Sequence, residues 1–244
     1  MANWAGCAVR REASVDSTNR AARRWAAQGA PHGAAVVALA QTAGRGRLGR
    51  HWESPAGAGL YLSLVLRPGP QSPVWPSLTF RAALAAADAC QAACGLRPAI
   101  KWPNDLVLSG RKISGILLER EGDAAVCGIG INVRQRAGDF PPELRGRAGS
   151  LEALSGRSVS LDALERALLA SLEARMDAPG WKADYTAQCV TLGRTVRVLA
   201  PDGAFDGFAE GLDDVGALLV RDEAGQVRRV LAGDVSVRSP EGYV

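Results

Sequence analysis

The chain has 244 residues, of which 47% are apolar and 22% charged, with a formal net charge of +4. This composition is typical of a soluble globular protein with one large domain, or one domain and a small appendage. The positive excess permits an anionic partner, but much of it lies in one loop, so it does not require bulk nucleic-acid binding. The N-terminus has no apolar signal core and no membrane-spanning stretch, which excludes a membrane partner and favours the cytoplasm.

The cysteines predict neither a metal site nor a disulfide framework. Five are present, an odd number, and none has the CxxC spacing of zinc or thioredoxin-like sites. Cys90 and Cys94 would lie one helical turn apart, where buried packing explains them better than metal binding. We therefore expect no structural metal and a reducing compartment. The cysteines are Cys7, Cys90, Cys94, Cys127 and Cys189.

The first predicted elements are a strand, a helix and a second strand. Val9 to Val15 has strand composition, and Asp16-Ser17-Thr18-Asn19 supplies N-cap chemistry for a helix that ends at Gly29. The apolar run Ala34 to Ala40 predicts a buried strand. Capping alone explains Ser17 to Asn19, but the backbone N–H groups at a helix start also point outward, so a polar ligand could dock there too.

The next stretch, Gly44-Arg45-Gly46-Arg47-Leu48-Gly49-Arg50, alternates arginine with glycine, and we call it the arginine loop. Glycine lets the backbone come close to a ligand, and arginine offers a planar fork of donors suited to phosphate or carboxylate. Neither property serves a hydrophobic core. By itself the stretch is equally compatible with an anion-binding loop, an exposed flexible basic loop and a nucleic-acid-binding segment.

The middle of the chain predicts a helix and then a meander of strands. Leu60 to Leu66 alternates like a strand, and Ser77 to Cys94 has apolar residues at helical spacing up to Gly95, which ends that helix. In Lys101-Trp102-Pro103-Asn104-Asp105-Leu106 the proline places Asn104 and Asp105 on a turn. The meander continues through Ile113 to Glu119 and Ala124 to Val133.

The chain from Arg134 onward predicts a loop, a helix and a small β domain. Residues 134–147 are polar with a Pro-Pro break, and Ser160 caps an amphipathic helix that packs on the core. From Gly193 short strands alternate with tight turns, so we divide the chain into domains 1–192 and 193–244. The expected strands are Val196 to Leu199, Phe205 to Gly211, Ala217 to Arg221 and Val227 to Leu231.

Collected in order, these motifs resemble those of bacterial biotin protein ligases. The resemblance runs from Asp16 to Val133, and Gly211 to Val237 resembles the family's SH3-like end domain more weakly. Several ordered motifs are strong support where any one would be weak. The motifs are Asp16 to Asn19, Gln41 to Arg50, Lys101 to Leu106, Arg111-Lys112 with Gly115-Ile116-Leu117, and Gly128 to Asn132.

The resemblance implies a fold and a reaction. The fold is an α+β catalytic domain, a mixed sheet with helices packed chiefly on one face as in class II aminoacyl-tRNA synthetases, plus a small C-terminal SH3-like β-barrel. The reaction joins biotin to Mg²⁺-ATP as biotinyl-5'-AMP, then transfers biotin to a lysine of a biotin carboxyl carrier protein. Two anions meet in the first step, so cationic donors must offset their repulsion. The resemblance leaves a homodimer possible.

The resemblance also implies roles for residues. Lys112, Arg45 and Arg47 would be the catalytic cations, and Asp105 would orient or deprotonate the incoming lysine. Biotin would contact Ser17, Thr18, Asn19, Gln41, Gly44, Arg45, Gly46, Arg47 and Lys112. ATP would contact Arg47, Arg50, Trp52, Lys101, Asn104, Lys112 and Asn132, and we expect Trp52 to stack near the adenine.

The sequence differs from some members of this family, and two other functions remain as alternatives. The motifs begin at Asp16, which leaves no room for the winged helix of some members, so we expect the monofunctional type and no DNA partner. Leu48 is arginine in some relatives. A lipoate-type ligase shares the fold and chemistry but does not usually carry the arginine loop. A basic nucleic-acid-binding module is the alternative from another class, although only 5% of residues are aromatic and no recognition-helix motif appears.

Overall fold

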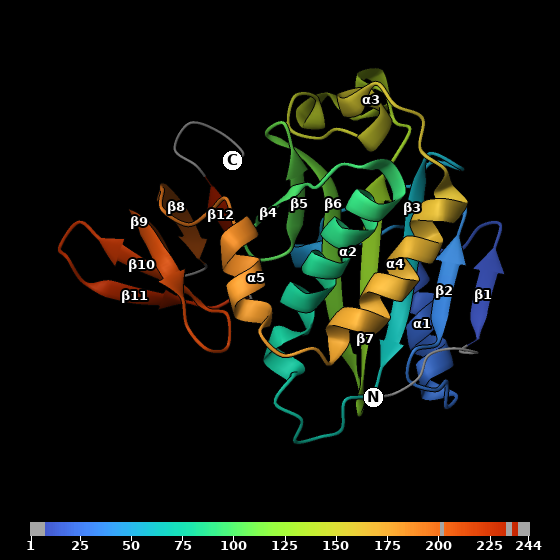
Figure 1. Ribbon diagram of the computed structural model, residues 1–244, viewed down its shortest axis with the longest axis horizontal. Coiled ribbons are helices and arrows are strands. Elements are labelled where there is room, and N and C mark those ends of the chain that lie inside the picture. Colours follow the sequence, from blue (N-terminus) through green and yellow to red (C-terminus); the bar gives the residue numbers. More distant parts are fainter. Residues whose placement is uncertain (1–7, 201–202, 233–235, 239–244) are drawn as a thin grey trace.

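The computed structural model describes residues 8–200, 203–232 and 236–238, and it contains two sheets (Figure 1). The larger has seven strands in the order β1-β2-β3-β7-β6-β5-β4, with β1 and β2 parallel and the other neighbours antiparallel. The expected mixed sheet and the meander from β4 to β7 are thereby confirmed. The strands are β1 Val9–Glu12, β2 Ala35–Ala38, β3 Gly59–Leu66, β4 Ala99–Lys101, β5 Asp105–Leu108, β6 Arg111–Glu121 and β7 Ala124–Asn132.

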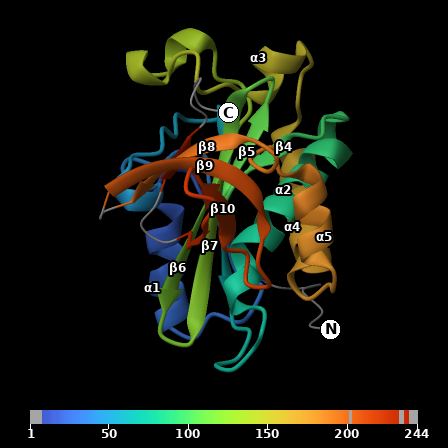
Figure 2. The ribbon, with the colours of Figure 1, turned by 90° about the vertical axis from the view of Figure 1, so that its left-hand side faces the viewer.

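Helices cover one face of this sheet almost entirely, and a single helix covers part of the other (Figure 2). The alternating leucines from Leu60 to Leu66 face α2 and α4, whereas Val65 faces α1. Alanines let α2 approach the sheet closely, and Gly95 ends it in the left-handed conformation at φ 71°. The helices are α1 Thr18–Ala27, α2 Leu78–Cys94, α3 Leu151–Ser155, α4 Leu161–Met176 and α5 Trp181–Gln188.

The structure adds short elements that periodicity did not predict. The helices α3 and α5 have five and eight residues, too short for a clear helical pattern. The first strand stops at Glu12, and Val15 makes only an isolated bridge to Gln41. Short 3₁₀ turns occur at Arg47–Gly49, Trp75–Ser77, Ala137–Asp139 and Pro142–Leu144. Cys7 lies outside the described residues, and the other four cysteines are free thiols.

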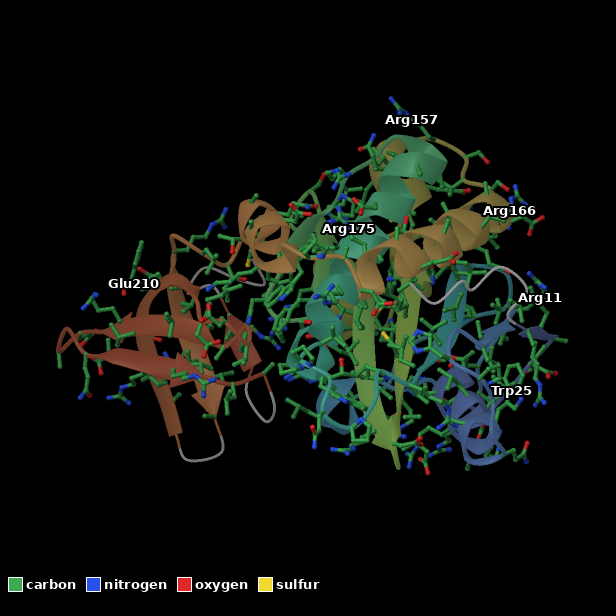
Figure 3. All side chains as sticks on the ribbon, turned by 60° about the horizontal axis from the view of Figure 1, so that its bottom comes forward. Arg11, Trp25, Arg157, Arg166, Arg175 and Glu210 are labelled. Atoms are coloured by element: carbon green, nitrogen blue, oxygen red, sulfur yellow. The ribbon has the colours of Figure 1, made fainter. Side chains whose placement is uncertain are left out.

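The second sheet is antiparallel, in the order β11-β10-β9-β8-β12, and packs beside α5 (Figure 1). The Trp102 indole donates a hydrogen bond to the Gly216 carbonyl at 3.0 Å, which ties this sheet to the end of β4. Gly216 also lies against Phe80, which stacks on Trp181 at 5.0 Å. Figure 3 shows Glu210 of this sheet at the opposite end of the molecule from Arg11 and Trp25. Its strands are β8 Thr195–Ala200, β9 Gly203–Leu212, β10 Leu218–Asp222, β11 Val227–Val230 and β12 Ser236–Arg238.

The sheet face that carries α1 also carries the glycines of the meander. Gly115 of β6 pairs with Gly130 of β7, and Leu117 pairs with Gly128. Side chains alternate between faces, so these positions share the face of Val126 and Val65, which pack on α1. The glycines leave a hollow on this face beside α1.

Candidate active site

A cavity of about 390 Å³ lies on this open face, bounded by the arginine loop, the start of α1, β6 and β7. It brings together residues that are more than a hundred positions apart in the chain. Every residue assigned to a site from the sequence lines it, with one exception. They are Ser17, Thr18, Asn19, Gln41, Arg45, Gly46, Arg47, Arg50, Trp52, Lys101, Asn104, Asp105, Lys112 and Asn132.

Gly44 is the exception, since it lies buried beneath the arginine loop and off the cavity wall. Its carbonyl accepts the backbone N–H of Trp52 at 3.0 Å. A Cβ at this position would lie 2.3 Å from the Trp52 carbonyl and 2.8 Å from Ser54 Oγ. Glycine is therefore needed there for the closure of the loop on itself.

One wall of the cavity is a polar network built on the first turn of α1. The Thr18 backbone N–H and hydroxyl both donate to Gln41 Oε1, at 2.8 and 3.1 Å, and Gln41 Nε2 donates to Ser54 Oγ at 2.8 Å. Ser17 is the N-cap residue and is 1% exposed, but its side chain makes no capping hydrogen bond. Capping therefore does not explain Ser17, and its hydroxyl is available at the cavity wall.

The arginine loop forms the opposite wall and is held by both sheets. Arg45 Nη1 donates to Glu119 at 2.9 Å, and Arg47 Nη1 donates to Asn104 Oδ1 at 2.8 Å. Arg47 also donates to the backbone carbonyl of Ala232, which follows β11 of the second sheet. Leu48 has φ 58° and ψ 35°, which only a few per cent of residues other than glycine adopt. The loop is therefore a tight turn fixed at several points by charge-assisted bonds.

The Trp52 indole forms the floor of the cavity, across Gly115 and Gly130. A Cβ on Gly130 would lie 2.5 Å from Trp52 Cε2 and Nε1, and one on Gly115 would lie 3.2 Å from Trp52 Cζ3. The Lys112 ammonium lies 5.5 Å from the centre of the ring. Trp52 Nε1 is buried and has no hydrogen-bond partner within the described residues. The two glycines thus let a flat aromatic ring lie directly on the sheet.

A cluster of charges closes the end of the cavity near β4 and β5. Lys112 Nζ lies 2.6 Å from Asp105 Oδ1. Lys101 is 4% exposed, and burial, with the nearby Arg238, Lys112 and Arg50 cations, lowers its pKa to about 7. The Asp105 carboxylate opposes this shift. Several cationic groups thus meet where little water can screen them, which disfavours the charged form of Lys101.

Asn132 lines the cavity, but its amide also supports a neighbouring loop. Its Nδ2 donates to the Gly149 carbonyl at 3.0 Å, and its Oδ1 accepts from Gln135 Nε2 at 3.2 Å. These bonds fix the two ends of the segment between Gln135 and Gly149. Asn132 therefore positions that segment over the cavity.

This segment and part of the second sheet contribute residues that the sequence did not predict. The polar stretch predicted only a loop, although its isolated apolar Phe140, now 4% exposed, was the available signal of a buried anchor. Two residues of β12, Val237 and Arg238, reach the cavity from a distant part of the chain, and no local pattern indicates this. The unpredicted lining residues include Phe140, Glu143, Leu144, Arg147, Ala148, Val237 and Arg238.

Neither a metal site nor a membrane-spanning helix is found among the described residues. Within residues 8–200, 203–232 and 236–238, no group of three or more His, Cys, Asp or Glu side chains is arranged to hold a metal ion. The same residues include no helix that is long and apolar enough to cross a bilayer.

Comparison with known proteins identifies the family of the chain. Residues 12–135 match the biotin/lipoate A/B protein ligase family, and residues 191–238 match the biotin protein ligase C terminal domain. The chain is 39% identical over 232 residues to the biotin–[acetyl-CoA-carboxylase] ligase of Paracoccus denitrificans, covering 88% of this chain and 94% of that protein. It is 36% identical over 234 residues to the bifunctional ligase/repressor BirA of Bacillus spizizenii, covering 91% of this chain and 72% of that protein.

A solved structure agrees over nearly the whole chain. The biotin protein ligase from Aquifex aeolicus in complex with biotin and ATP superposes with a TM-score of 0.84 and 30% identity, covering 95% of this chain and 99% of that one. Sequence and fold therefore agree in both domains. The chain belongs to the biotin protein ligases within the biotin/lipoate A/B protein ligase family, and it is an enzyme of that family.

Proposed function

We propose that the enzyme forms biotinyl-5'-AMP from biotin and ATP and then transfers biotin to one lysine of a biotin carboxyl carrier protein. The observation that carries this proposal is a single cavity with a polar wall on one side and the arginine loop, Lys101 and Lys112 on the other. The polar wall suits a neutral, hydrogen-bonding head group, and the cations suit a carboxylate and phosphates. The Aquifex relative binds both biotin and ATP.

In the first step an oxygen of the biotin carboxylate attacks the α-phosphorus of ATP, and pyrophosphate leaves. Both reactants are anions, so the barrier falls when fixed cations face the charge that gathers on the phosphorus oxygens. We assign this role to Lys112, Arg45 and Arg47. Each is already held, by Asp105, Glu119 and Asn104 respectively, so little reorganisation is needed when the substrates arrive. Mg²⁺ would enter with the phosphates of ATP.

In the second step the carrier lysine amine attacks the acyl carbon, AMP leaves, and the amine loses a proton. Asp105 is the carboxylate proposed to orient that amine, because it lies on the cavity wall beside Lys112. In this proposal residues 1–192 bind biotin, and residues 193–244 assist ATP use and the docking of the carrier. The printed name of the Paracoccus relative supports an acetyl-CoA-carboxylase subunit as the acceptor.

The proposal is tested by incubating the protein with ATP, Mg²⁺, biotin and a carrier domain of acetyl-CoA carboxylase. We expect intact mass spectrometry to show a gain of one biotinyl group on the carrier, and exchange of labelled pyrophosphate into ATP that requires biotin. A carrier with its acceptor lysine changed to arginine is the matched control. Exchange and mass gain with lipoate in place of biotin would instead support the lipoate-type alternative.

A further inference from the structure

The Glu119 carboxylate joins two parts of the cavity wall that are distant in the chain. It projects from β6, its side chain is 16% exposed, and its two oxygens have different partners. Oε1 accepts from Arg45 Nη1 at 2.9 Å, and Oε2 accepts from Asn19 Nδ2 at 2.8 Å. One carboxylate therefore holds a cation of the arginine loop and an amide of the first turn of α1. Glu119 itself does not line the cavity.

The bond to Asn19 fixes the polar wall. Asn19 Nδ2 also donates to the Leu117 carbonyl at 3.3 Å, and Asn19 Oδ1 lies 2.6 Å from Ser63 Oγ. Ser63 Oγ in turn lies 2.8 Å from Thr18 Oγ1, which donates to Gln41. Asn19 has donors on one end of its amide and an acceptor on the other, so its contact with Glu119 sets the direction of the whole network.

The bond to Arg45 fixes a side chain that would otherwise be mobile. Arg45 is 36% exposed and sits on a glycine-rich loop, where ordering a long side chain costs up to about 2 kcal/mol in conformational entropy. Pairing with Glu119 orders it before any ligand arrives. Arg23 lies farther from the same carboxylate, at 3.7 Å, and is held by Glu121 at 2.6 Å. Arg45 is therefore the main cationic partner of Glu119.

We infer that Glu119 is a positioning residue for the biotin half of the cavity, acting through Arg45 and Asn19 without touching the substrate. The inference rests on the function proposed above, in which the polar wall suits the biotin head group and Arg45 is one of the cations that face the reacting anions. Glutamine at this position would keep the shape but lose the charge. Its amide N–H₂ would also face either Arg45 or Asn19 Nδ2, so that two donors meet and one bond is lost.

The first test is Glu119→Gln, assayed by biotin-dependent pyrophosphate exchange. Charge-assisted bonds of this kind are worth about tenfold or more in binding, so we expect the KM for biotin to rise at least about tenfold while the KM for ATP stays within about twofold. Glu121→Gln is the matched control, since Glu121 is two residues farther along the same strand face and, among the described residues, pairs with Arg23 alone. It should leave both KM values unchanged.

The second test asks whether Glu119 acts through Arg45. Adding Glu119→Gln to an Arg45→Ala background should raise the KM for biotin by less than about threefold, because the two changes remove one shared interaction. Glu119→Asp keeps the charge but is too short to reach both partners, so it should shift the KM for biotin in the same direction even if the glutamine variant folds poorly. If the wild type is active and both Glu119 variants have the same KM for biotin as the wild type, this inference alone is overturned. A folded wild type without biotin-dependent exchange would overturn the proposed function and the inference with it.

Discussion

The Lys112 ammonium lies 2.6 Å from the Asp105 carboxylate, on the wall of the cavity. The two residues sit on adjacent antiparallel strands, where β5 meets β6 beside an irregularity in the register. Asp105 and Lys112 are 15% and 27% exposed, so solvent screens their interaction only in part. The pair therefore places a cation and a potential proton acceptor at one point of the site.

The first prediction separates these two roles. Lys112→Ala should lower the rate of biotin-dependent pyrophosphate exchange about a hundredfold or more, because it removes an electrostatic donor to the transition state. Asp105→Asn should lower transfer to the carrier more than it lowers exchange, because the amine enters only in the second step. Arg111→Ala removes the adjacent exposed cation, which does not line the cavity, and should change neither rate. Near-wild-type exchange by Lys112→Ala would refute the assignment.

The second prediction concerns the pH dependence of ATP binding. Lys101 has a pKa of about 7, so in the empty site its amine is about nine-tenths neutral at pH 8 and about one-tenth neutral at pH 6. Phosphates favour the charged form, so ATP binding should take up nearly one proton at pH 8 and far less at pH 6. Calorimetry in two buffers of different ionisation enthalpy measures this difference. Lys101→Met should abolish the uptake, and a wild type with equal uptake at both pH values would contradict it.

The same group affects stability in a defined direction. The folded pKa of Lys101 lies below its ordinary value of 10.5, so between these values the folded state binds fewer protons than the unfolded state. Its contribution to the free energy of unfolding should therefore rise as pH increases from about 7 towards 10.5, and the cost of burying the charge is fully present below pH 7. Comparing denaturant unfolding of wild type and Lys101→Met at pH 6 and pH 9 checks the sign.

The third prediction concerns the glycines beneath Trp52. Gly130→Ala would bring a methyl group within 2.5 Å of the indole, which must then leave the sheet. Overpacking of this kind costs about 1–3 kcal/mol. If Trp52 stacks near the adenine, as the family resemblance implies, the KM for ATP should rise because the indole moves. Gly211→Ala is the control, since a Cβ there has open space and no positive φ. Unchanged ATP kinetics in Gly130→Ala would show that the indole position does not matter for the nucleotide.

The fourth prediction concerns the attachment of the second sheet. A Cβ on Gly216 would lie 2.1 Å from Phe80 Cε2, so Gly216→Ala should push the sheet away from the aromatic cluster. The domain of this sheet supplies the Ala232 carbonyl, just after β11, to Arg47 and supplies Arg238 to the cavity. ATP use should therefore weaken while biotin affinity by calorimetry stays within about twofold. Gly225→Ala is the matched control, because Gly225 has nearly the same positive φ as Gly216, 80° against 87°. A Cβ on Gly225 would meet no atom within 4 Å.

A more severe test of the same relationship is to delete the C-terminal domain. Truncation after Leu192 should impair ATP use and carrier transfer more than biotin binding, because Ser17, Thr18 and Gln41 all precede the cut. Circular dichroism would establish that the shortened chain is folded. Complete loss of biotin binding in a folded truncation would mean that the second sheet builds the biotin pocket.

The local elements and the chemical groups of the site could be predicted from the amino-acid sequence. Alternation of leucines predicted β3, helical spacing up to Gly95 predicted α2, and turn residues predicted the meander, because these patterns depend only on neighbours in the chain. The arginine loop and the Lys101 to Asp105 stretch carried the resemblance. Each of those assignments concerns residues within a few positions of one another.

Which of these groups lie next to one another depends on the tertiary structure. Glu119 reaches Arg45 across 74 positions, and the Ala232 carbonyl reaches Arg47 across 185, contacts set by strand register and by the packing of the second sheet. The structure also showed the close packing of Gly44 against Trp52, and brought Phe140 and Arg147 to the site from a stretch that looked like an ordinary polar loop. A one-dimensional pattern fixes the face on which a side chain lies, but the partner across that face depends on how distant strands align.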